Sequence, residues 1–137
     1  MNTNCAIIVE DFKLIAQAWG RILEKSKLFS EIHLLYDAES IEQKIAKLNP
    51  KLILMDVNLP NSKNGIEITQ NLIKTNPDLK IIILTMHNEP VYVKKALEAG
   101  AKGYVTKNSP ITEINKAIEE VIKGNEYICE EILEFCL

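Results

Sequence analysis

The chain has 137 residues, of which 47% are hydrophobic and 26% are charged, and its formal net charge is −3. This length suits one domain with a substantial core, and the negative charge predicts no affinity of this chain alone for nucleic acids. No apolar run approaches the ~18 residues that a membrane span needs, and no signal-peptide pattern begins the chain, so we expect a cytoplasmic protein with no membrane contact.

Short apolar runs alternate with amphipathic stretches along the chain, and this alternation predicts strands followed by helices. Five apolar runs bounded by turn residues are expected to be strands: residues 5–9, 32–36, 52–56, 80–85 and 102–106. Apolar residues at helical spacing predict five helices: residues 12–25, 38–48, 66–75, 88–100 and 109–124. Residues 129–137 are expected to form a short amphipathic tail.

Polar and turn-forming residues predict where these elements begin. Asp37, Asn88 and Ser109 are expected at the starts of the second, fourth and fifth helices, where short polar side chains accept hydrogen bonds from free backbone amides. Residues 57–65 are expected to form a loop, because they combine asparagines with a proline and a glycine.

The five alternations of strand and helix predict one α/β domain, with a parallel sheet, right-handed crossovers and helices on both faces. Ligands of such sheets bind at the edge formed by the carboxyl ends of the strands. The polar residues that end the predicted strands are therefore the candidates for chemistry: Glu10, Asp11, Asp56, Thr85 and Lys107.

These residue types together favour phosphoryl chemistry at that edge. Three neighbouring carboxylates repel one another and call for a cation, and Mg²⁺ prefers such hard oxygen ligands. Lys107 and Thr85 add a positive charge and a hydroxyl donor, which suit the oxygens of a phosphoryl group. Asp56 ends the central strand between the acidic pair and these two residues, so it is the expected nucleophile.

The segments that carry these residues resemble the receiver domains of two-component response regulators. The resemblance covers residues 6–124 and rests on four motifs: I-I-V-E-D, L-I-L-M-D-V-N-L-P, I-I-I-L-T-M-H and A-L-E-A-G-A-K-G-Y-V-T-K. The last motif, followed by N-S-P, is most similar to receivers that precede a C-terminal helix-turn-helix of the LuxR/NarL type.

The resemblance implies a fold and a domain division. The implied fold is a flavodoxin-like, doubly wound α/β domain, with a five-stranded parallel sheet in the order 2-1-3-4-5 and five helices. Residues 1–124 would form the receiver, and residues 125–137 would begin a linker or C-terminal extension.

The resemblance also implies a role for each phosphoryl-binding residue. Asp56 would accept a phosphoryl group from the phosphohistidine of a sensor histidine kinase. Thr85 and Lys107 would bind the phosphoryl oxygens. Tyr104 would be the switch aromatic, which reorients when Thr85 moves toward the phosphate.

A second set of implied roles concerns the metal and the lifetime of the phosphoryl group. Asp11 and Asp56 would ligate Mg²⁺ directly, together with the backbone carbonyl of Asn58, and Glu10 would act mainly through a metal-bound water. The side chains of Asn58 and His87 occupy the positions that tune the aspartyl-phosphate lifetime in this family.

The implied function is a switch that controls an output by changing its surface. The expected output is transcription, through a DNA-binding domain absent from this chain, and DNA would be contacted only through that domain. The alternative is a stand-alone receiver or phosphorelay protein that acts by protein contact. A homodimer through the fourth helix, fifth strand and fifth helix is expected, and the chain is predicted to be a signalling domain rather than an enzyme.

Three competing functions fit the sequence less well. A phosphatase of the haloacid-dehalogenase type would need D-x-D at the end of the first strand, whereas Asp56 ends the third strand and is followed two residues later by Asn58. A nucleotide- or flavin-binding domain would need a glycine-rich loop after the first strand. A degenerate receiver would have lost site residues, but all of them are present.

Overall fold

The computed structural model describes residues 4–61 and 63–136; residues 1–3, 62 and 137, which fall within the predicted spans, lie outside it. The six strands of the main sheet are β1 (Cys5–Val9), β2 (Glu31–Leu35), β3 (Leu52–Met55), β6 (Ile81–Thr85), β7 (Gly103–Thr106) and β8 (Tyr127–Ile128). The helices are α1 (Lys13–Ser26), α2 (Ile41–Leu48), α3 (Gly65–Thr75), α4 (Pro90–Glu98), α5 (Ile111–Ile122) and α6 (Glu130–Cys136). None of the described helices is long and apolar enough to cross a membrane.

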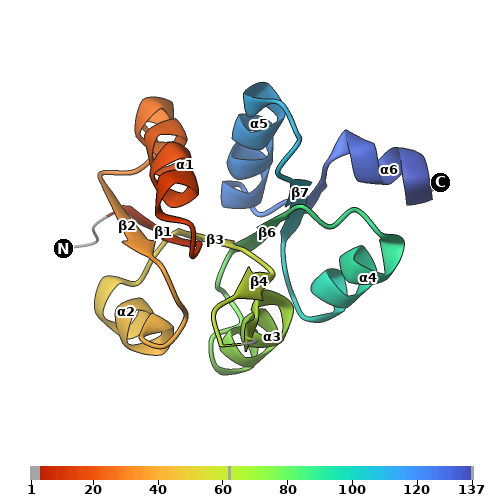
Figure 1. The fold of residues 1–137 in the computed structure, drawn as a ribbon. Coiled ribbons are helices and arrows are strands. Elements are labelled where there is room, and N and C mark those ends of the chain that lie inside the picture. Colours follow the sequence, from red (N-terminus) through yellow and green to blue (C-terminus); the bar gives the residue numbers. More distant parts are fainter. Residues whose placement is uncertain (1–3, 62, 137) are drawn as a thin grey trace.

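All strands of the main sheet are parallel, in the order β2-β1-β3-β6-β7-β8. Helices α1 and α5 cover one face, and α2, α3 and α4 cover the other (Figure 1). The order predicted for the first five strands is confirmed. The chain moves from β1 to β2 and then back across β1 to β3, so its direction across the sheet reverses between β1 and β3. Such a reversal leaves a crevice at the carboxyl ends of these two strands.

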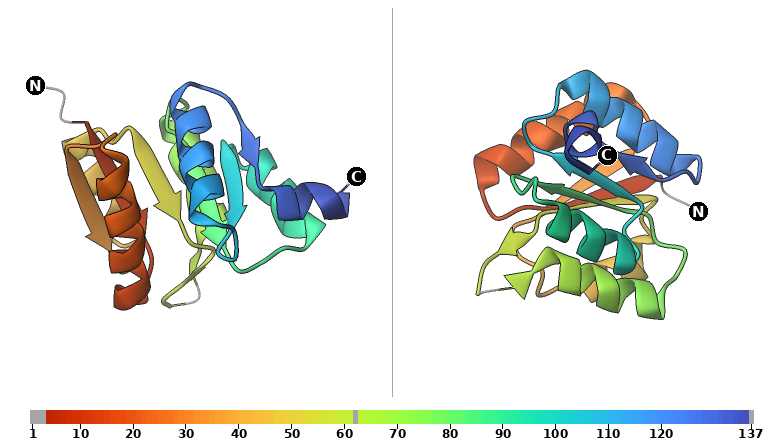
Figure 2. Two further views of the ribbon diagram at one scale, coloured as in Figure 1. Left: turned by 90° about the horizontal axis from the view of Figure 1, so that it is seen from above. Right: turned by 90° about the vertical axis from the view of Figure 1, so that its right-hand side faces the viewer.

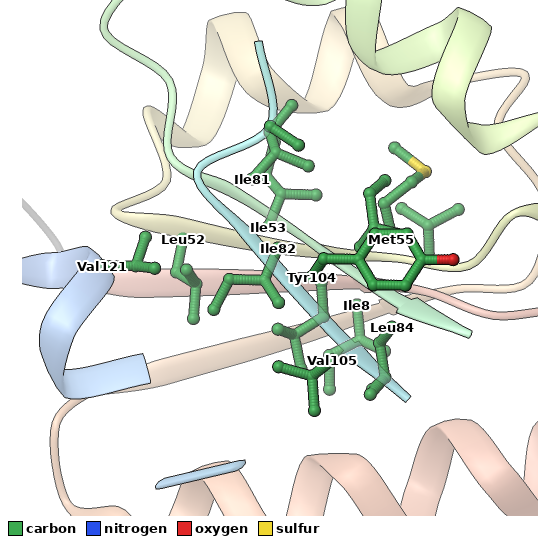
Figure 3. Packing of buried hydrophobic residues seen from close by; sticks show 14 of the residues in the cluster. Ile8, Leu52, Ile53, Met55, Ile81, Ile82, Leu84, Tyr104, Val105 and Val121 are labelled. Carbon is green, nitrogen blue, oxygen red and sulfur yellow. The ribbon is translucent and has the colours of Figure 1, made fainter. Parts of the chain in front are cut away.

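The core lies on both sides of the central strands. Every residue of β1, β3, β6 and β7 is buried, because helices cover both faces of the sheet. Their side chains interdigitate above and below the sheet, and Tyr104 lies among the aliphatic residues (Figure 3). The edge strand β2 is half exposed. Apolar runs predicted the central strands well because both of their faces are apolar.

Three predicted helix caps are wrong. Helix α2 begins only at Ile41, and Asp37 instead accepts a hydrogen bond from the backbone N–H of Glu39 at 3.0 Å. Short acidic side chains readily bind such nearby turn amides instead of helix amides. Asn88 lies one residue too early, because Pro90 opens α4 and the preceding residue is held in an extended conformation.

The cap predicted for α5, Ser109, also lies one residue too early, because Pro110 occupies the capping position with an extended backbone. The Ser109 hydroxyl instead lies 3.2 Å from the Thr106 hydroxyl. The cap of α3 is Asn64, whose side chain accepts from the backbone N–H of Ile66 at 2.8 Å.

The predicted loop over residues 57–65 contains a small antiparallel hairpin. Its strands are β4 (Asn58–Leu59) and β5 (Lys63–Asn64), with Asn58 opposite Asn64. Two-residue strands are too short to produce a periodic pattern, so the sequence shows only the turn residues. The hairpin leads from the end of β3 directly into α3.

The C-terminal segment adds a strand that the sequence did not predict, and helix α6 lies within residues 129–137, where an amphipathic tail was predicted. β8 pairs in parallel with β7, and α6 contacts α4 (Figure 2). The sheet therefore has six strands where five were expected. Cys129 and Ile132 in this segment are fully buried. The division into a receiver (1–124) and a linker (125–137) stays a prediction.

Candidate functional site

The carboxyl ends of β1 and β3 bring three carboxylates together. Glu10 and Asp11 follow β1 and Asp56 follows β3, whose end is tied to β1 by a 3.1 Å hydrogen bond from the Asp56 N–H to the Val9 carbonyl. Each carboxylate offers an oxygen within 4.8 Å of the other two. Glu10 is 2% exposed, Asp56 is 7% exposed and Asp11 is half-buried. The edge of the sheet formed by the ends of β1 and β3 is therefore strongly acidic.

Lys107 supplies a positive charge that faces this cluster. It follows β7, and its backbone N–H donates to the Thr85 carbonyl at 2.8 Å. Its Nζ contacts Glu10 Oε1 and lies 3.2 Å from Asp56 Oδ2. Burial by itself lowers the pKa of Lys107, but the hydrogen bond to Glu10 and the charge of Asp56 outweigh burial and raise it. Lys107 is therefore a fixed cation.

One ammonium does not balance three carboxylates. Together they carry a formal charge of −2. Burial, followed by the neighbouring Glu10 carboxyl, raises the pKa of Asp11, so the site disfavours a further negative charge. Hard oxygen ligands with excess negative charge fit a divalent cation such as Mg²⁺.

Asp11→Asn is expected to raise the free energy of unfolding of the metal-free protein near neutral pH, by less than about 1 kcal/mol because Asp11 is partly solvated. Folding raises the pKa of Asp11. At a pH above the folded pKa, the ionised carboxylate therefore lowers the free energy of unfolding. At a pH below the unfolded pKa, about 3.9, the carboxyl is protonated in both states and has no such effect. Urea unfolding near pH 7 and near pH 3 measures the difference, which should vanish at the lower pH. With excess Mg²⁺ the wild type should become more stable than Asp11→Asn. A metal-free variant less stable than wild type near pH 7 would contradict the repulsion.

Thr85 is the last residue of β6 and is 1% exposed. Its hydroxyl oxygen accepts a hydrogen bond from the backbone N–H of His87 at 3.3 Å. Asp56 Oδ1 meanwhile accepts from the backbone N–H of Val57 at 2.8 Å. In this arrangement the hydroxyl of Thr85 holds the loop between β6 and α4.

His87 links that loop to the β4–β5 hairpin. The side-chain amide nitrogen of Asn58 lies within hydrogen-bond distance of His87 Nε2, at 3.0 Å. Nδ1 lies 3.7 Å from Glu89 Oε2, and the ring stacks on Tyr92 with centroids 4.3 Å apart. The two residues predicted to tune the phosphoryl lifetime are thus in direct contact.

Tyr104 points inward from β7 and is fully buried (Figure 3). Its hydroxyl donates to the backbone carbonyl of His87 at 2.7 Å. Burial raises the pKa of Tyr104, so the hydroxyl keeps its proton as a donor. The same loop is therefore held from two sides, by Thr85 and by Tyr104.

Trp19, the single tryptophan of the chain, lies behind the acidic cluster. It lines a small internal gap together with Glu10, Asp56 and aliphatic residues of the central strands. The indole is 9% exposed, and its Nε1 has no hydrogen-bond partner among the described residues.

Comparison with known proteins identifies the family. A family model for the response regulator receiver domain matches residues 6–119. The chain belongs to the response regulator receiver family. The resemblance inferred from the strand-end motifs is thereby confirmed.

Two relatives of this receiver are named for regulatory functions. The transcriptional regulatory protein DegU of Brevibacillus brevis is 34% identical over 122 residues, which cover 89% of this chain and 51% of DegU. The oxygen regulatory protein NreC of Staphylococcus carnosus (strain TM300) is 30% identical over 122 residues, which cover 89% of this chain and 56% of NreC. The receiver spans about half the length of the curated relatives that it matches.

Solved structures agree with the fold. A two-component response regulator of the LuxR family from Aurantimonas sp. SI85-9A1 is 30% identical, with a TM-score of 0.90 over 96% of this chain and 94% of that chain. A CheY-like receiver from Methanospirillum hungatei JF-1 is 25% identical, with a TM-score of 0.79 over 89% of this chain and 95% of that chain. The flavodoxin-like fold and the likeness to LuxR-type receivers are confirmed.

Gly65 is a residue of the receiver site that sequence reasoning missed. It begins α3, and its N–H donates to the Val57 carbonyl at 2.8 Å. A Cβ at this position would lie 1.8 Å from the backbone oxygen of Asp56. The sequence shows only an Asn–Gly pair in a loop, because the close approach arises from tertiary packing.

Gly65→Ala is expected to lower the free energy of unfolding by about 1–3 kcal/mol, because backbone atoms must move to make room for the methyl group. The movement would displace Asp56 itself. Gly20→Ala is the matched control, since Gly20 lies inside α1 and its added Cβ would meet only a side chain at 3.5 Å. Urea unfolding of both variants should show a loss for Gly65→Ala and none for Gly20→Ala. If Gly65→Ala were as stable as Gly20→Ala, the backbone at the start of α3 could accommodate the added methyl group without cost.

Proposed function

We propose that this receiver accepts a phosphoryl group on Asp56 from the phosphohistidine of a sensor histidine kinase, with Mg²⁺ bound at the acidic cluster. One observation carries the proposal: Asp56 belongs to the acidic cluster and also faces the ammonium of Lys107. A nucleophile flanked by a cation site and a fixed cation suits transfer of a group with three charged oxygens.

The residues divide the chemistry among them. Asp11 and Asp56 would ligate Mg²⁺ with the backbone carbonyl of Asn58, and Glu10 would act through a metal-bound water. When bound, the ion offsets charge on the transferring oxygens. A carboxylate oxygen of Asp56 forms the new bond to phosphorus as the bond from phosphorus to the histidine nitrogen breaks.

Lys107 would follow the phosphoryl group and pair with one of its oxygens. Its present contact with Asp56 supports this role, because the oxygens of a phosphorylated Asp56 would start within reach of the same ammonium. The contact with Glu10 holds the ammonium in place before transfer.

Thr85 would donate its hydroxyl to the phosphoryl group and so act as the switch. Its oxygen already accepts a hydrogen bond from the backbone N–H of His87, and a hydroxyl can accept and donate at once. A movement of Thr85 toward the phosphoryl group would therefore draw on the loop that carries His87. The hydroxyl of Tyr104 donates to the backbone carbonyl of His87, so a movement of this loop would also change the environment of Tyr104. Phosphorylation would shift the population between two arrangements of this loop.

The output of the switch is part of the proposal. The likeness to the transcriptional regulatory protein DegU favours transcription control through a DNA-binding domain that lies outside this chain. A stand-alone receiver or phosphorelay protein is the alternative, and a helix-turn-helix encoded after Leu137 in the same reading frame would decide against it. A homodimer through α4, β7 and α5, a cytoplasmic location and a signalling rather than enzymatic role stay predictions.

Mass measurement of the intact protein tests the proposal. The protein is incubated with a small acyl-phosphate donor, once with Mg²⁺ and once with a chelator. The expected result is a gain of one phosphoryl group with Mg²⁺ and none with the chelator. No gain in either sample, with the fold intact, would favour a degenerate receiver that works by protein contact alone.

A further inference from the structure

Trp19 lies on the buried face of α1, together with Ala16, Gly20 and Leu23. Its indole N–H has no hydrogen-bond partner among the described residues. A buried indole usually finds such a partner, because an unpaired donor loses the hydrogen bond that water would give it. An apolar side chain could fill the same space without this cost. Packing alone therefore does not account for a tryptophan at this position.

The alternation of side chains along the strands places the acidic cluster on the same side of the sheet as Trp19. Ile8 of β1 and Leu84 of β6 point toward α1 (Figure 3). Glu10 comes two positions after Ile8, so its side chain points to the same side. These three residues, Asp56 and Trp19 line one internal gap, which is too narrow to hold a water molecule. The indole and the carboxylates therefore face a shared, dry space.

Both carboxylate oxygens of Glu10 are bound by other groups in this state. Oε1 accepts a hydrogen bond from the ammonium of Lys107, and Oε2 accepts one from the backbone N–H of Phe12 at 3.3 Å. Because Glu10 is only 2% exposed, water could not replace a donor that moved away. Departure of Lys107 would leave Oε1 as a buried, charged oxygen without a donor, which is costly.

Phosphorylation of Asp56 would draw Lys107 away from Glu10. A phosphoryl group carries about two negative charges, so it competes strongly for the ammonium with the single charge of Glu10. Oε1 of Glu10 would then lack a donor, while the indole N–H of Trp19 already lacks an acceptor. The two unpaired groups line the same gap, and a hydrogen bond between them would satisfy both.

We propose that Trp19 is a positioning residue of this receiver, whose indole N–H donates to the Glu10 carboxylate once Lys107 turns to the phosphoryl group. The inference rests on the proposed function. The new hydrogen bond holds Glu10 at the metal site after its ammonium partner has left. Because the bond forms only in the phosphorylated state, it shifts the population toward that state.

NMR of the ¹⁵N-labelled protein and intact mass, measured on the same sample, test this inference. The single tryptophan gives one indole N–H signal, which a new hydrogen bond to a carboxylate moves to lower field. The signal should make this move after treatment with the acyl-phosphate donor and Mg²⁺, and not with Mg²⁺ alone. A gain in mass without the move would overturn the inference and leave the proposed function intact. No gain in mass would overturn the proposed function and the inference with it.

Lys107→Met tests the acceptor without phosphorylation. It removes the ammonium from Glu10, so the indole signal should move to lower field in the unphosphorylated variant. Adding Glu10→Ala should cancel the move, because the acceptor is then absent. Lys94→Met, on α4, is the control and should leave the signal in place. An unmoved signal in Lys107→Met, or a move that persists without Glu10, would overturn the assignment of Glu10 as the acceptor.

Trp19→Phe removes the donor and keeps an aromatic ring. The rate of phosphorylation should fall at least about fivefold, because a hydrogen bond to a charged group is lost from the state being formed. Leu23→Val is the matched control, since Leu23 is fully buried on the same face of α1 and has no polar side-chain atom. Urea unfolding should show lower stability for both variants, whereas only Trp19→Phe should slow phosphorylation. Equal slowing would mean that Trp19 acts by packing alone and would overturn the inference.

Discussion

Asp56→Asn is expected to reduce phosphorylation of the receiver by at least about a hundredfold, because the amide lacks the nucleophilic carboxylate oxygen. The substitution also removes one of the three acidic groups of the cluster and so weakens Mg²⁺ binding. The measurement is the rate of gain of one phosphoryl mass from a small acyl-phosphate donor with Mg²⁺. Asparagine has nearly the same shape as aspartate, so the fold should be kept.

Asp37→Asn is the matched control for this prediction. Asp37 is exposed and accepts a turn hydrogen bond that an asparagine oxygen can also accept. The control should be phosphorylated at the wild-type rate. If Asp56→Asn still gained one phosphoryl group at a similar rate, the acceptor would be another carboxylate, and Glu10 and Asp11 would be examined next.

Lys107→Met is expected to lower the free energy of unfolding of the metal-free protein by about 3 kcal/mol, because it leaves buried carboxylates without their cation. The side chain of Lys107 is 12% exposed, and those of Glu10 and Asp56 are 2% and 9% exposed, so water offers little compensation. Methionine keeps an unbranched chain of similar length, so the decrease in the free energy of unfolding measures the effect of removing the positive charge. Mg²⁺ should restore part of the stability, since it neutralises the same carboxylates.

Urea unfolding with and without Mg²⁺ measures this effect. Lys94→Met on α4 is the matched control, since Lys94 is exposed and forms no ion pair with any described residue. The control should change stability by no more than about 0.5 kcal/mol. A Lys107→Met variant as stable as the control would mean that the carboxylates take up protons at little cost.

The strands, and the meeting of the strand-end residues at one edge of the sheet, could be predicted because both depend on simple patterns. A strand covered on two faces is apolar at every position, as in β3, and therefore shows in the sequence. A polar residue directly after such a run must lie at the carboxyl edge of the sheet. This is why Asp56 and Lys107, distant in sequence, could be expected near each other.

Other features depend on tertiary contacts that leave no local pattern. Asp37 has the composition of a helix cap, yet its side chain binds a turn amide before α2 begins. The need for glycine at Gly65 comes from the carbonyl of Asp56, which lies nine positions earlier in the chain. β8 is too short to give a periodic signal and forms only because β7 offers an edge.

The position of Trp19 gives this receiver a built-in optical probe. The indole lines an internal gap together with Glu10 and Asp56, so we expect its emission to respond to the electric field of those carboxylates. A change of charge on either side of the gap should alter fluorescence intensity or wavelength, and the chain has no second tryptophan to obscure it. The proposed metal binding and phosphorylation should therefore be measurable in real time on the unlabelled chain.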